Sequence, residues 1–463
     1  KDMRNIERVS SNFFRGAAHG RRRARILAAV GVAVFVGGSA GAETLRLSLR
    51  DAVSRALSEG TAARIATERV DLSRAQADQA RSALLPQLSG QVQDYNQVLN
   101  LKTFGLALPG FPTLVGPFNV FDAHVTLAAQ LIDLAARRRY QAARQGIVVA
   151  DIERERTENE VATAVATLYV SLQRAQANVE ATSANVELFT KLRDLANDQR
   201  EAGVATKLDS TRADVALSRE RQTLLVSENQ RNAARLSLLH AIGADQTLDV
   251  LLVDALQDEP ATETPDEALS AARSRRPELR SIEERLRSID LSIAARKAEK
   301  LPTLAAQFQG GYNGNHLGDL SWNRTVGALV SVPIYTGGRI SAEIAESESQ
   351  RRELLLERTE TQRQVEEEVR RALLALESAA NRAHVAAENV RLASDELEFA
   401  RDRFANGVTS SIEVDNAQSS YSSARADRIA ALADEAQARF DLARATGQIR
   451  DWMGSATDVR QEK

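Results

Sequence analysis

The longest hydrophobic pattern in the chain is a narrow seam inside 340–406, a stretch that contains no Gly or Pro. Apolar residues recur there at alternating steps of four and three, which is the 3.5-residue period of a coiled coil. A helix over this stretch would be about 100 Å long, and it gains stability only by packing on partner helices. The seam consists of Val365, Val369, Ala372, Leu376, Ala379, Ala383, Ala386, Val390, Ala393, Leu397, Ala400 and Phe404.

The same seam occurs a second time, 204 positions earlier, at 161–200. Two pairs of glycines have the same offset, Gly203 with Gly407 and Gly243 with Gly447. Unrelated heptads would have no reason to agree in phase with these glycines, so the pattern indicates an internal duplication. The long helices are expected to end at Gly203 and Gly407, and each is expected to be followed by a returning helix, at 204–242 and 408–446.

Four shorter stretches alternate apolar and polar residues with a period of two, which predicts β-strands. They are expected at about 87–98, 118–132, 303–312 and 324–334. Strands of about ten residues have the length that crosses a bilayer when tilted. A helix comes before each pair of strands, and a Pro at 86 or 302 marks where that helix stops.

Each half therefore reads as a helix, a strand hairpin, a long helix and a returning helix, in a fold that is mainly α with a small β part. The expected divisions are a first repeat at 43–244, a linker at 245–277, a second repeat at 278–447 and a tail at 448–463. The loop inside the first hairpin is rich in Gly and Pro and longer than its counterpart in the second.

Four amphipathic strands are too few to close a barrel in lipid. The smallest closed membrane barrels have about eight strands, and an open sheet edge is not tolerated in the bilayer. If these strands span a membrane, several copies must complete one wall, and three copies would supply 12 strands. After position 42 the sequence has no run of 18 apolar residues, so insertion through a transmembrane helix is excluded on length.

Composition supports long helices and argues against a catalyst. Aromatic residues are 4% of the chain and charged residues 27%, which is closer to long helices than to compact cores. The absence of Cys removes disulfides, thiolate metal sites and Cys nucleophiles. The five His residues do not occur at metal-ligand spacing. The sequence therefore predicts no enzymatic activity, no cofactor and no metal site.

The first 42 residues have the features of a secretory signal with an upstream extension. A cluster of Arg at 21–25 precedes the apolar run 26–36, and small residues follow at Ala40 and Ala42. The alternative, an N-terminal anchor helix, has too few apolar positions to span a bilayer. Removing 1–42, which carries a net charge of +6, changes the chain's charge from −3 to about −9. An acidic exported rod does not fit nucleic-acid binding.

With these residues the chain resembles the TolC-like outer-membrane factors, the exit ducts of tripartite efflux pumps and type I secretion systems. The resemblance covers essentially everything after Ala42. It rests on five features: the run Val332-Pro333-Ile334-Tyr335-Thr336-Gly337-Gly338-Arg339, the run Leu131-Ile132-Asp133, the prolines at 86 and 302 that end the preceding helices, Gly203-Val204, and Gly407-Val408.

The resemblance implies a homotrimer in the outer membrane of a Gram-negative bacterium. Its strands would form a 12-stranded β-barrel in outer-membrane lipid, and its helices an α-helical barrel across the periplasm. The linker and chain ends would form an equatorial belt. It also implies two partners, a periplasmic adaptor and an inner-membrane pump that is driven by protons or by ATP. The adaptor would dock on the helix tips, at Gly203, Val204, Gly407 and Val408; a plain reading of both glycines is a helix C-cap.

Acids near the tips are the candidate constriction. The resemblance places Asp209 and Glu413 at the narrow periplasmic end, with Asp415 and Asn416 beside the second. A ring of carboxylates in a narrow pore favours cations, whereas the simpler reading is a solvated acid at a helix start. The chain also departs from the family pattern, because Phe404 stands where a Tyr would donate a hydrogen bond.

The second departure is Thr409, which stands where an Arg would bridge. The best-known closing network of the family therefore cannot form here, and the gate is expected to depend on other contacts.

The leading hypothesis is a passive outer-membrane exit duct, with small-molecule efflux favoured over protein secretion. The alternative is a periplasmic coiled-coil scaffold or adaptor without a channel. A scaffold accounts for the seams but not for the duplicated amphipathic strands. The cargo, the pump and the resting state of the gate are not encoded in any pattern we identify.

Overall fold

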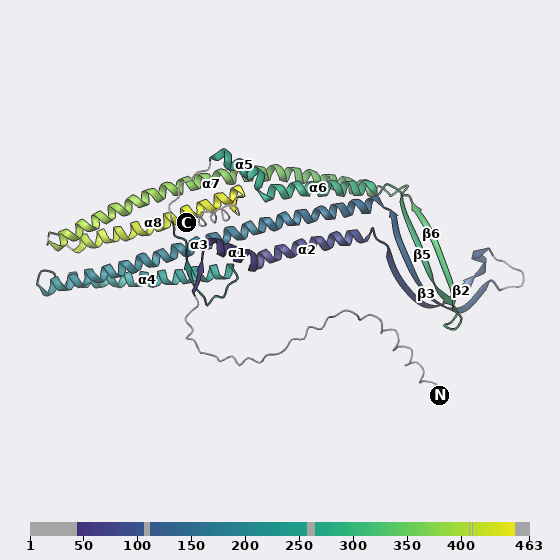
Figure 1. Cartoon of the computed structure of the whole chain (residues 1–463), viewed down its shortest axis with the longest axis horizontal. Helices are drawn as coiled ribbons and strands as arrows, with labels where there is room; N and C mark the ends of the chain where they lie inside the picture. Colours follow the sequence, from purple (N-terminus) through teal and green to yellow (C-terminus); the bar gives the residue numbers. More distant parts are fainter. Residues whose placement is uncertain (1–43, 106–111, 257–263, 407, 410, 450–463) are drawn as a thin grey trace, which may run out of the picture. The chain divides into compact units, whose positions relative to one another are not determined.

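The structure is a computed structural model that describes residues 44–105, 112–256, 264–406, 408–409 and 411–449. Most of the described chain is helical. The two longest helices are α3 (Leu134–Glu201) and α7 (Arg339–Ala405). Each is followed by a returning helix, α4 (Lys207–Ala241) or α8 (Ser411–Thr446). Helices α3 and α4 lie side by side, as do α7 and α8 (Figure 1).

Three expectations lie outside the described residues. They are the secretory signal at 1–42, Gly407, and the part of the tail beyond Ile449.

The heptad seam of α7 is the buried stripe of that helix. Ten of its 12 positions are buried, and Ala379 and Ala383 are only 1% and 2% exposed. Because most of these side chains are Ala, each contact buries little apolar area but lets the helix backbones approach closely. The seam packs on α8 through several separate clusters, one of which also includes Leu188 and Leu192 of α3. The predicted long helix and its packing stripe are confirmed.

Side-chain caps mark where several helices begin. The Asp133 carboxylate accepts a 2.8 Å hydrogen bond from the backbone N–H of Ala136 at the start of α3. At the start of α4, Thr206 and Asp209 form a capping box, in which each side chain bonds the other residue's backbone N–H. Thr264 and Glu267 form a second capping box at α5 (Pro265–Arg275).

The other described helices lie at the beginning of each half. They are α1 (Leu49–Glu59) and α2 (Thr61–Ser82) in the first half and α6 (Pro277–Ala298) in the second. A short 3₁₀ helix, η1, follows the first long strand at Leu101–Phe104. Both α2 and α6 pack on α3, and α6 also packs on α7, so α6 connects the two halves.

Four long strands form one antiparallel sheet in the order β2-β3-β5-β6 (Figure 1). They are β2 (Gln87–Asn100), β3 (Leu114–Ile132), β5 (Thr303–Gly314) and β6 (Ser321–Ser331). In the first hairpin Leu88 lies opposite Leu127, and in the second Leu304 lies opposite Val330. These two pairs occupy equivalent positions of the two halves, so both hairpins share one register.

The ends of the strands differ from those expected. The last strand was expected at 324–334 but ends at Ser331. Pro333 has no N–H to donate to a strand ladder, and the glycines at 337 and 338 adopt φ values of 61° and 83° just before α7. The residues between the strand and α7 are therefore a connecting turn.

A second, two-stranded sheet was not expected. Its parallel strands are β1 (Thr44–Leu47) and β4 (Asp249–Leu252), with Leu45 opposite Val250. The hydrophobic pattern of 45–58 taken alone is that of one short amphipathic element, but the structure divides this stretch. The first residues instead form the strand, and Ser48 caps α1. Alternation of apolar and polar residues over only three or four positions is too short a signal to separate from a helix turn.

Tyr169 of α3 holds this small sheet in place. Its hydroxyl lies 3.1 Å from the Leu47 carbonyl and 3.0 Å from the Asp254 carboxylate, two acceptors that share its single O–H, and the residue is only 1% exposed. Burial, together with the Asp254 carboxylate, raises the pKa of the Tyr169 hydroxyl. The surrounding core includes Val165, Leu172 and other apolar residues from α1, α4 and β4.

Candidate functional site

The four-stranded sheet has one apolar face. Its rows of cross-strand neighbours can be followed through the register of all four strands. One row is Leu88, Leu127, Phe308 and Val326; another is Val92, Ala123, Tyr312 and Trp322. The rings of Tyr312 and Trp322 stack edge to face with their centroids 5.2 Å apart. Leu88, Val92 and Val326 are each more than 70% exposed in a single chain.

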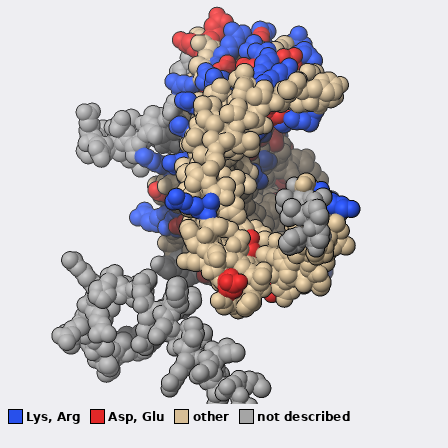
Figure 2. Space-filling view, turned by 90° about the vertical axis from the view of Figure 1, so that its right-hand side faces the viewer, with Lys and Arg blue, Asp and Glu red and all other residues tan. Residues whose placement is uncertain are grey.

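The opposite face of the sheet is polar. Its rows consist mainly of Gln, Asn, Ser and Thr, such as Ser89, Thr126, Gln309 and Thr325. In the view from the end of the molecule that carries the sheet, charged side chains gather at the top and are sparse over the middle and lower part (Figure 2). The four described strands contain only three Asp, Glu, Lys or Arg residues, namely Asp94, Asp122 and Arg324. Such a sheet suits lipid on one side and water on the other.

Both outer strands of this sheet are open. In the strand order β2-β3-β5-β6, β2 and β6 each have a neighbour on one side only within the described chain. Backbone N–H and C=O groups on a free edge need partners when lipid surrounds them. Within the row Leu88, Leu127, Phe308 and Val326, the two edge residues are 71% and 73% exposed, against 39% for each of the two inner residues.

The tips of the helical pairs present apolar side chains to solvent. Gly203 adopts φ 77° and ends the α3 segment, and the N–H of Val204 bonds the Gln199 carbonyl at 2.9 Å. At the other tip the N–H of Val408 bonds the Arg403 carbonyl at 2.8 Å. Val204 and Val408 are 77% and 67% exposed. At both tips, therefore, the N–H of an exposed Val bonds the carbonyl five residues earlier.

The structure does not bring the four candidate constriction residues together. Glu413 accepts a 2.9 Å hydrogen bond from Arg403 and another from the hydroxyl of Thr409, so it is held within the α7–α8 pair. Asp209 is held at the start of α4 by its capping box. Asn416 is exposed. Thr409 therefore bonds an acid of its own hairpin.

Asp415 faces the other hairpin. Burial raises the pKa of its carboxyl, the positive charge of Arg212 opposes that shift, and the negative charge of Asp209 adds to it. Asp209 and Arg212 approach each other at 3.9 Å. Asp415, Arg212 and Asp209 thus form one charged cluster between α8 and α4.

Beside this cluster lies a cavity of about 320 Å³ that the sequence did not suggest. It is lined by Phe189, Arg212, Arg219, Glu220 and Asp415, among others. Burial raises the pKa of Glu220, which accepts a hydrogen bond from Asn185. Arg212 and Asp209 are three residues apart and so lie on one helix face. This spacing is the sequence feature that could have indicated the charged cluster beside the cavity.

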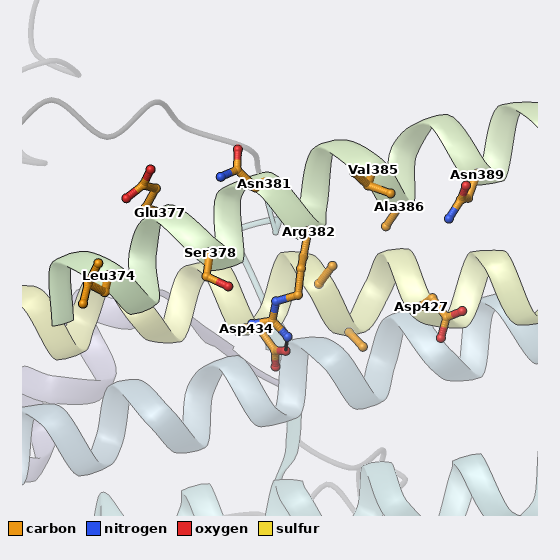
Figure 3. Close-up of a pocket in the computed structure, with 12 residues that line it drawn as sticks. Leu374, Glu377, Ser378, Asn381, Arg382, Val385, Ala386, Asn389, Asp427 and Asp434 are labelled. Carbon is orange, nitrogen blue, oxygen red and sulfur yellow. Dashed lines mark hydrogen bonds and ion pairs between the residues drawn. The ribbon is translucent and has the colours of Figure 1, made fainter. Parts of the chain in front are cut away.

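A second, larger groove of about 770 Å³ runs between α7 and α8 (Figure 3). Its apolar lining includes Val385, Ala386 and Ala431, and charged side chains border it. Arg382 and Asp434 bridge the two helices at 3.1 Å. Among the described residues, no group of three or more His, Asp or Glu side chains is placed so that it could hold a metal ion. Within those same ranges no helix combines the length and apolar character needed to cross a bilayer.

An amphipathic sheet with open edges, continued by paired helices, defines the class of outer-membrane channel proteins with a long helical extension. A sequence model of the outer membrane efflux protein family matches residues 52–244 and 268–448. The chain belongs to this family, whose members are channels in the outer membrane of Gram-negative bacteria. The resemblance found in the sequence is thereby confirmed.

Relatives by sequence are outer-membrane efflux proteins. The chain is 23% identical over 404 residues to the probable efflux pump outer membrane protein TtgC of Pseudomonas putida, a match that covers 84% of this chain and 81% of TtgC. It is 25% identical over 255 residues to the outer membrane efflux protein BepC of Brucella suis. That match covers 54% of this chain, which spans 55% of the length of BepC.

Solved structures share the fold. The outer membrane protein VceC from Vibrio cholerae superposes with a TM-score of 0.72 at 17% identity, over 86% of this chain and 96% of VceC. A membrane protein from Pseudomonas aeruginosa gives 0.73 at 22% identity, over 86% and 90% of the two chains.

Proposed function

We propose that this protein is the passive exit duct of a tripartite efflux system, built by several copies of the chain. The observation that carries the proposal is the four-stranded sheet with one apolar face and two open edges. The apolar face would contact outer-membrane lipid, and the polar face would line water. No energy-converting chemistry is assigned to the chain; the inner-membrane pump would supply the energy.

Three copies would give a closed 12-stranded barrel, continued by an α-helical barrel across the periplasm. The two repeats, 43–244 and 278–447, would alternate around its axis, joined by a linker at 245–277 that contributes to an equatorial belt. Matching of the family in two segments supports this division. A secretory signal within 1–42 would direct export.

The internal duplication gives the register at which one copy should join the next. Within one chain, Leu127 of β3 lies opposite Phe308 of β5. The residue of β6 equivalent to Leu127 is Val330, and the residue of β2 equivalent to Phe308 is Val92, because the offsets between the repeats are 203 and 216. Val330 of one copy is therefore expected opposite Val92 of the next.

A pair of cysteines tests closure, and the chain has no natural Cys to interfere. Val92→Cys with Val330→Cys should give covalent oligomers that end at a closed trimer on a denaturing gel after mild oxidation in membranes. The matched control, Val92→Cys with Leu329→Cys, places the thiols on opposite faces of the sheet and should not cross-link. Chains that stay monomeric in both cases would refute the closed barrel and leave a scaffold as the better account.

The tips would be the docking site of the periplasmic adaptor. Support comes from the exposed Val204 and Val408, which offer apolar area at the end of each helical pair. Gly203, with its φ of 77°, would let the chain turn at the first tip, and Gly407 is proposed as its counterpart at the second. Val204→Asp should abolish co-purification with the periplasmic adaptor of this system while leaving the oligomer intact.

The constriction would be formed by Asp209, Glu413, Asp415 and Asn416 at the periplasmic end. The charged cluster of Asp415, Arg212 and Asp209 supports a contact between the two hairpins at this level. Such a contact would substitute for the bridge that Phe404 and Thr409 cannot make.

Small-molecule efflux is the cargo class we favour over type I protein secretion. Relatives carry names such as toluene efflux pump outer membrane protein TtgC and pyoverdine export outer membrane protein OpmQ. Deletion of the gene should therefore raise sensitivity to small toxic compounds without blocking secretion of a protein substrate.

A further inference from the structure

The polar face of the sheet carries one isolated acid and one histidine, and these two side chains are paired. Asp122 and His124 are the only Asp, Glu, Lys, Arg or His residues on that face of the four described strands. His124 Nδ1 lies 3.1 Å from Asp122 Oδ1. Their side chains are 11% and 23% exposed.

Amides of the neighbouring strand β2 fix the acid in place. Gln93 Nε2 donates to Asp122 Oδ2 at 3.1 Å, and Gln91 Nε2 donates to Gln93 Oε1 at 3.2 Å. With one oxygen bonded to an amide and the other to the imidazole, the Asp122 carboxylate has a set orientation. The negative charge of Asp122 therefore has a fixed position on the polar face of the sheet.

Strand β5 leaves room for the imidazole. Gly311 lies opposite His124 in the sheet. A Cβ at position 311 would come within 2.6 Å of His124 Cβ and within 2.2 Å of the Ala123 carbonyl oxygen. A residue larger than Gly would therefore displace the strand that carries His124, so the sequence of β5 is adapted to the pair.

Other strand charges do not face the pair. The neighbours on β2 are Gln91 and Gln93 and those on β5 are Gly311 and Asn313, none of which is charged. The two remaining charged residues of the strands, Asp94 and Arg324, occupy the apolar face by register. With the imidazole neutral the pair has a charge of −1, and with the imidazole protonated its charge is 0.

We propose that Asp122 and His124 set the ion preference of the membrane part of the duct and make that preference depend on pH. This rests on the proposed function, in which the polar face lines the water-filled interior. Small inorganic cations and cationic cargo are favoured while the imidazole is neutral, and the preference falls when it is protonated. Comparison of the channel at an alkaline and an acidic pH therefore tests the role of the pair.

The test measures the reversal potential of the reconstituted full-length protein in a KCl gradient at pH 8 and pH 5.5. The ratio of K⁺ to Cl⁻ permeability should fall roughly twofold to threefold in the wild type on acidification, the effect of one unit charge across several ångströms of water. His124→Asn should remove this fall. Asp122→Asn should lower the ratio at pH 8 to its acid value.

Asp94→Asn is the matched control, since it removes the same charge from the adjacent strand on the other face. It should leave the permeability ratio unchanged. Equal pH responses in wild type and His124→Asn, or a larger effect of Asp94→Asn than of Asp122→Asn, would overturn the inference. Absence of any current from the wild type would instead count against the proposed duct.

Chemical modification tests the charge at position 122 without the hydrogen bonds that Asp122 makes to Gln93 and His124. Asp122→Cys supplies a single thiol that a charged methanethiosulfonate can modify. The sulfonate reagent should restore the cation preference and the trimethylammonium reagent should reverse it. Asp94→Cys should respond to neither, and an unreactive Asp122→Cys in conducting channels would show that this position does not face the water.

Discussion

The guanidinium of Arg276, which is 6% exposed, lies 2.8 Å from the carboxylate of Glu368 on α7. The same group approaches Glu278 at 3.0 Å and donates to the backbone carbonyls of Arg444 and Ala445 at the end of α8. One side chain thus joins the start of α6 to α7 and to the last turn of α8. Its positive charge also suits the carboxyl end of a helix.

Removing this arginine should destabilise the protein. Arg276→Met keeps most of the volume but leaves Glu368 and two carbonyls without their partner, at a cost of about 2 kcal/mol after allowing for the partial exposure of both acids. Chemical denaturation of the oligomer measures the loss. Arg370→Met is the control, because its pair with Glu366 is exposed and such pairs contribute less than about 1 kcal/mol. Equal effects would contradict the bridging role.

Two glycines should respond in opposite directions to the same substitution. Gly203 adopts φ 77° at the tip, where a Cβ is strained, so Gly203→Ala should cost about 1 kcal/mol. Gly146 lies inside α3 with no atom within 4 Å of an added Cβ, so Gly146→Ala should stabilise by about 0.5–1 kcal/mol. Thermal unfolding compares them. A stabilised Gly203→Ala would mean that the tip does not require a left-handed residue.

The contact between the hairpins at Asp415 should tighten in acid. Its folded-state pKa is raised, so its favourable contribution is fully present below the unfolded-state pKa of Asp and is lost as pH rises through the folded-state value. Asp415→Asn should therefore slow amide exchange in α8 near neutral pH and have little effect near pH 3. Faster exchange in this variant at neutral pH would show that attraction to Arg212 outweighs burial. Arg212→Gln should speed exchange at neutral pH.

The acid of the second tip should contribute to ion preference. Glu413→Gln removes one negative charge per copy from the proposed constriction, so the reconstituted channel should prefer cations less strongly. A salt gradient across a lipid film measures the change. Unchanged selectivity would leave Glu413 with only its structural role, the hydrogen bonds from Arg403 and Thr409.

Long-period patterns predicted most of this fold. The heptad spacing of Val369, Ala379 and Leu397 specified a buried stripe over many turns, and the structure buries all three. The two-residue alternation around Val125 and Val326 likewise identified strands before their pairing was known. Repetition over tens of residues averages out local exceptions, which explains why these elements could be predicted.

Short and tertiary features could not be predicted in the same way. The pairing of Leu45 with Val250 depends on a contact across about 200 residues and leaves only a few positions of pattern. The approach of Asp415 to Arg212 depends on how two hairpins pack, and the bond of Glu413 to Arg403 depends on how α7 and α8 pack. Sequence spacing carries information along one helix but not between helices.

The parallel pairing of β1 with β4 also constrains when the protein can finish folding. Residues 44–47 have no strand partner until residues 249–252 are available, so more than two hundred residues must follow them before this ladder can form. Closing so long a loop is slow compared with making local helical turns. During export, β1 would thus stay unpaired until β4 has also crossed the membrane. The small sheet, and with it the fold of the first half, would be completed only then.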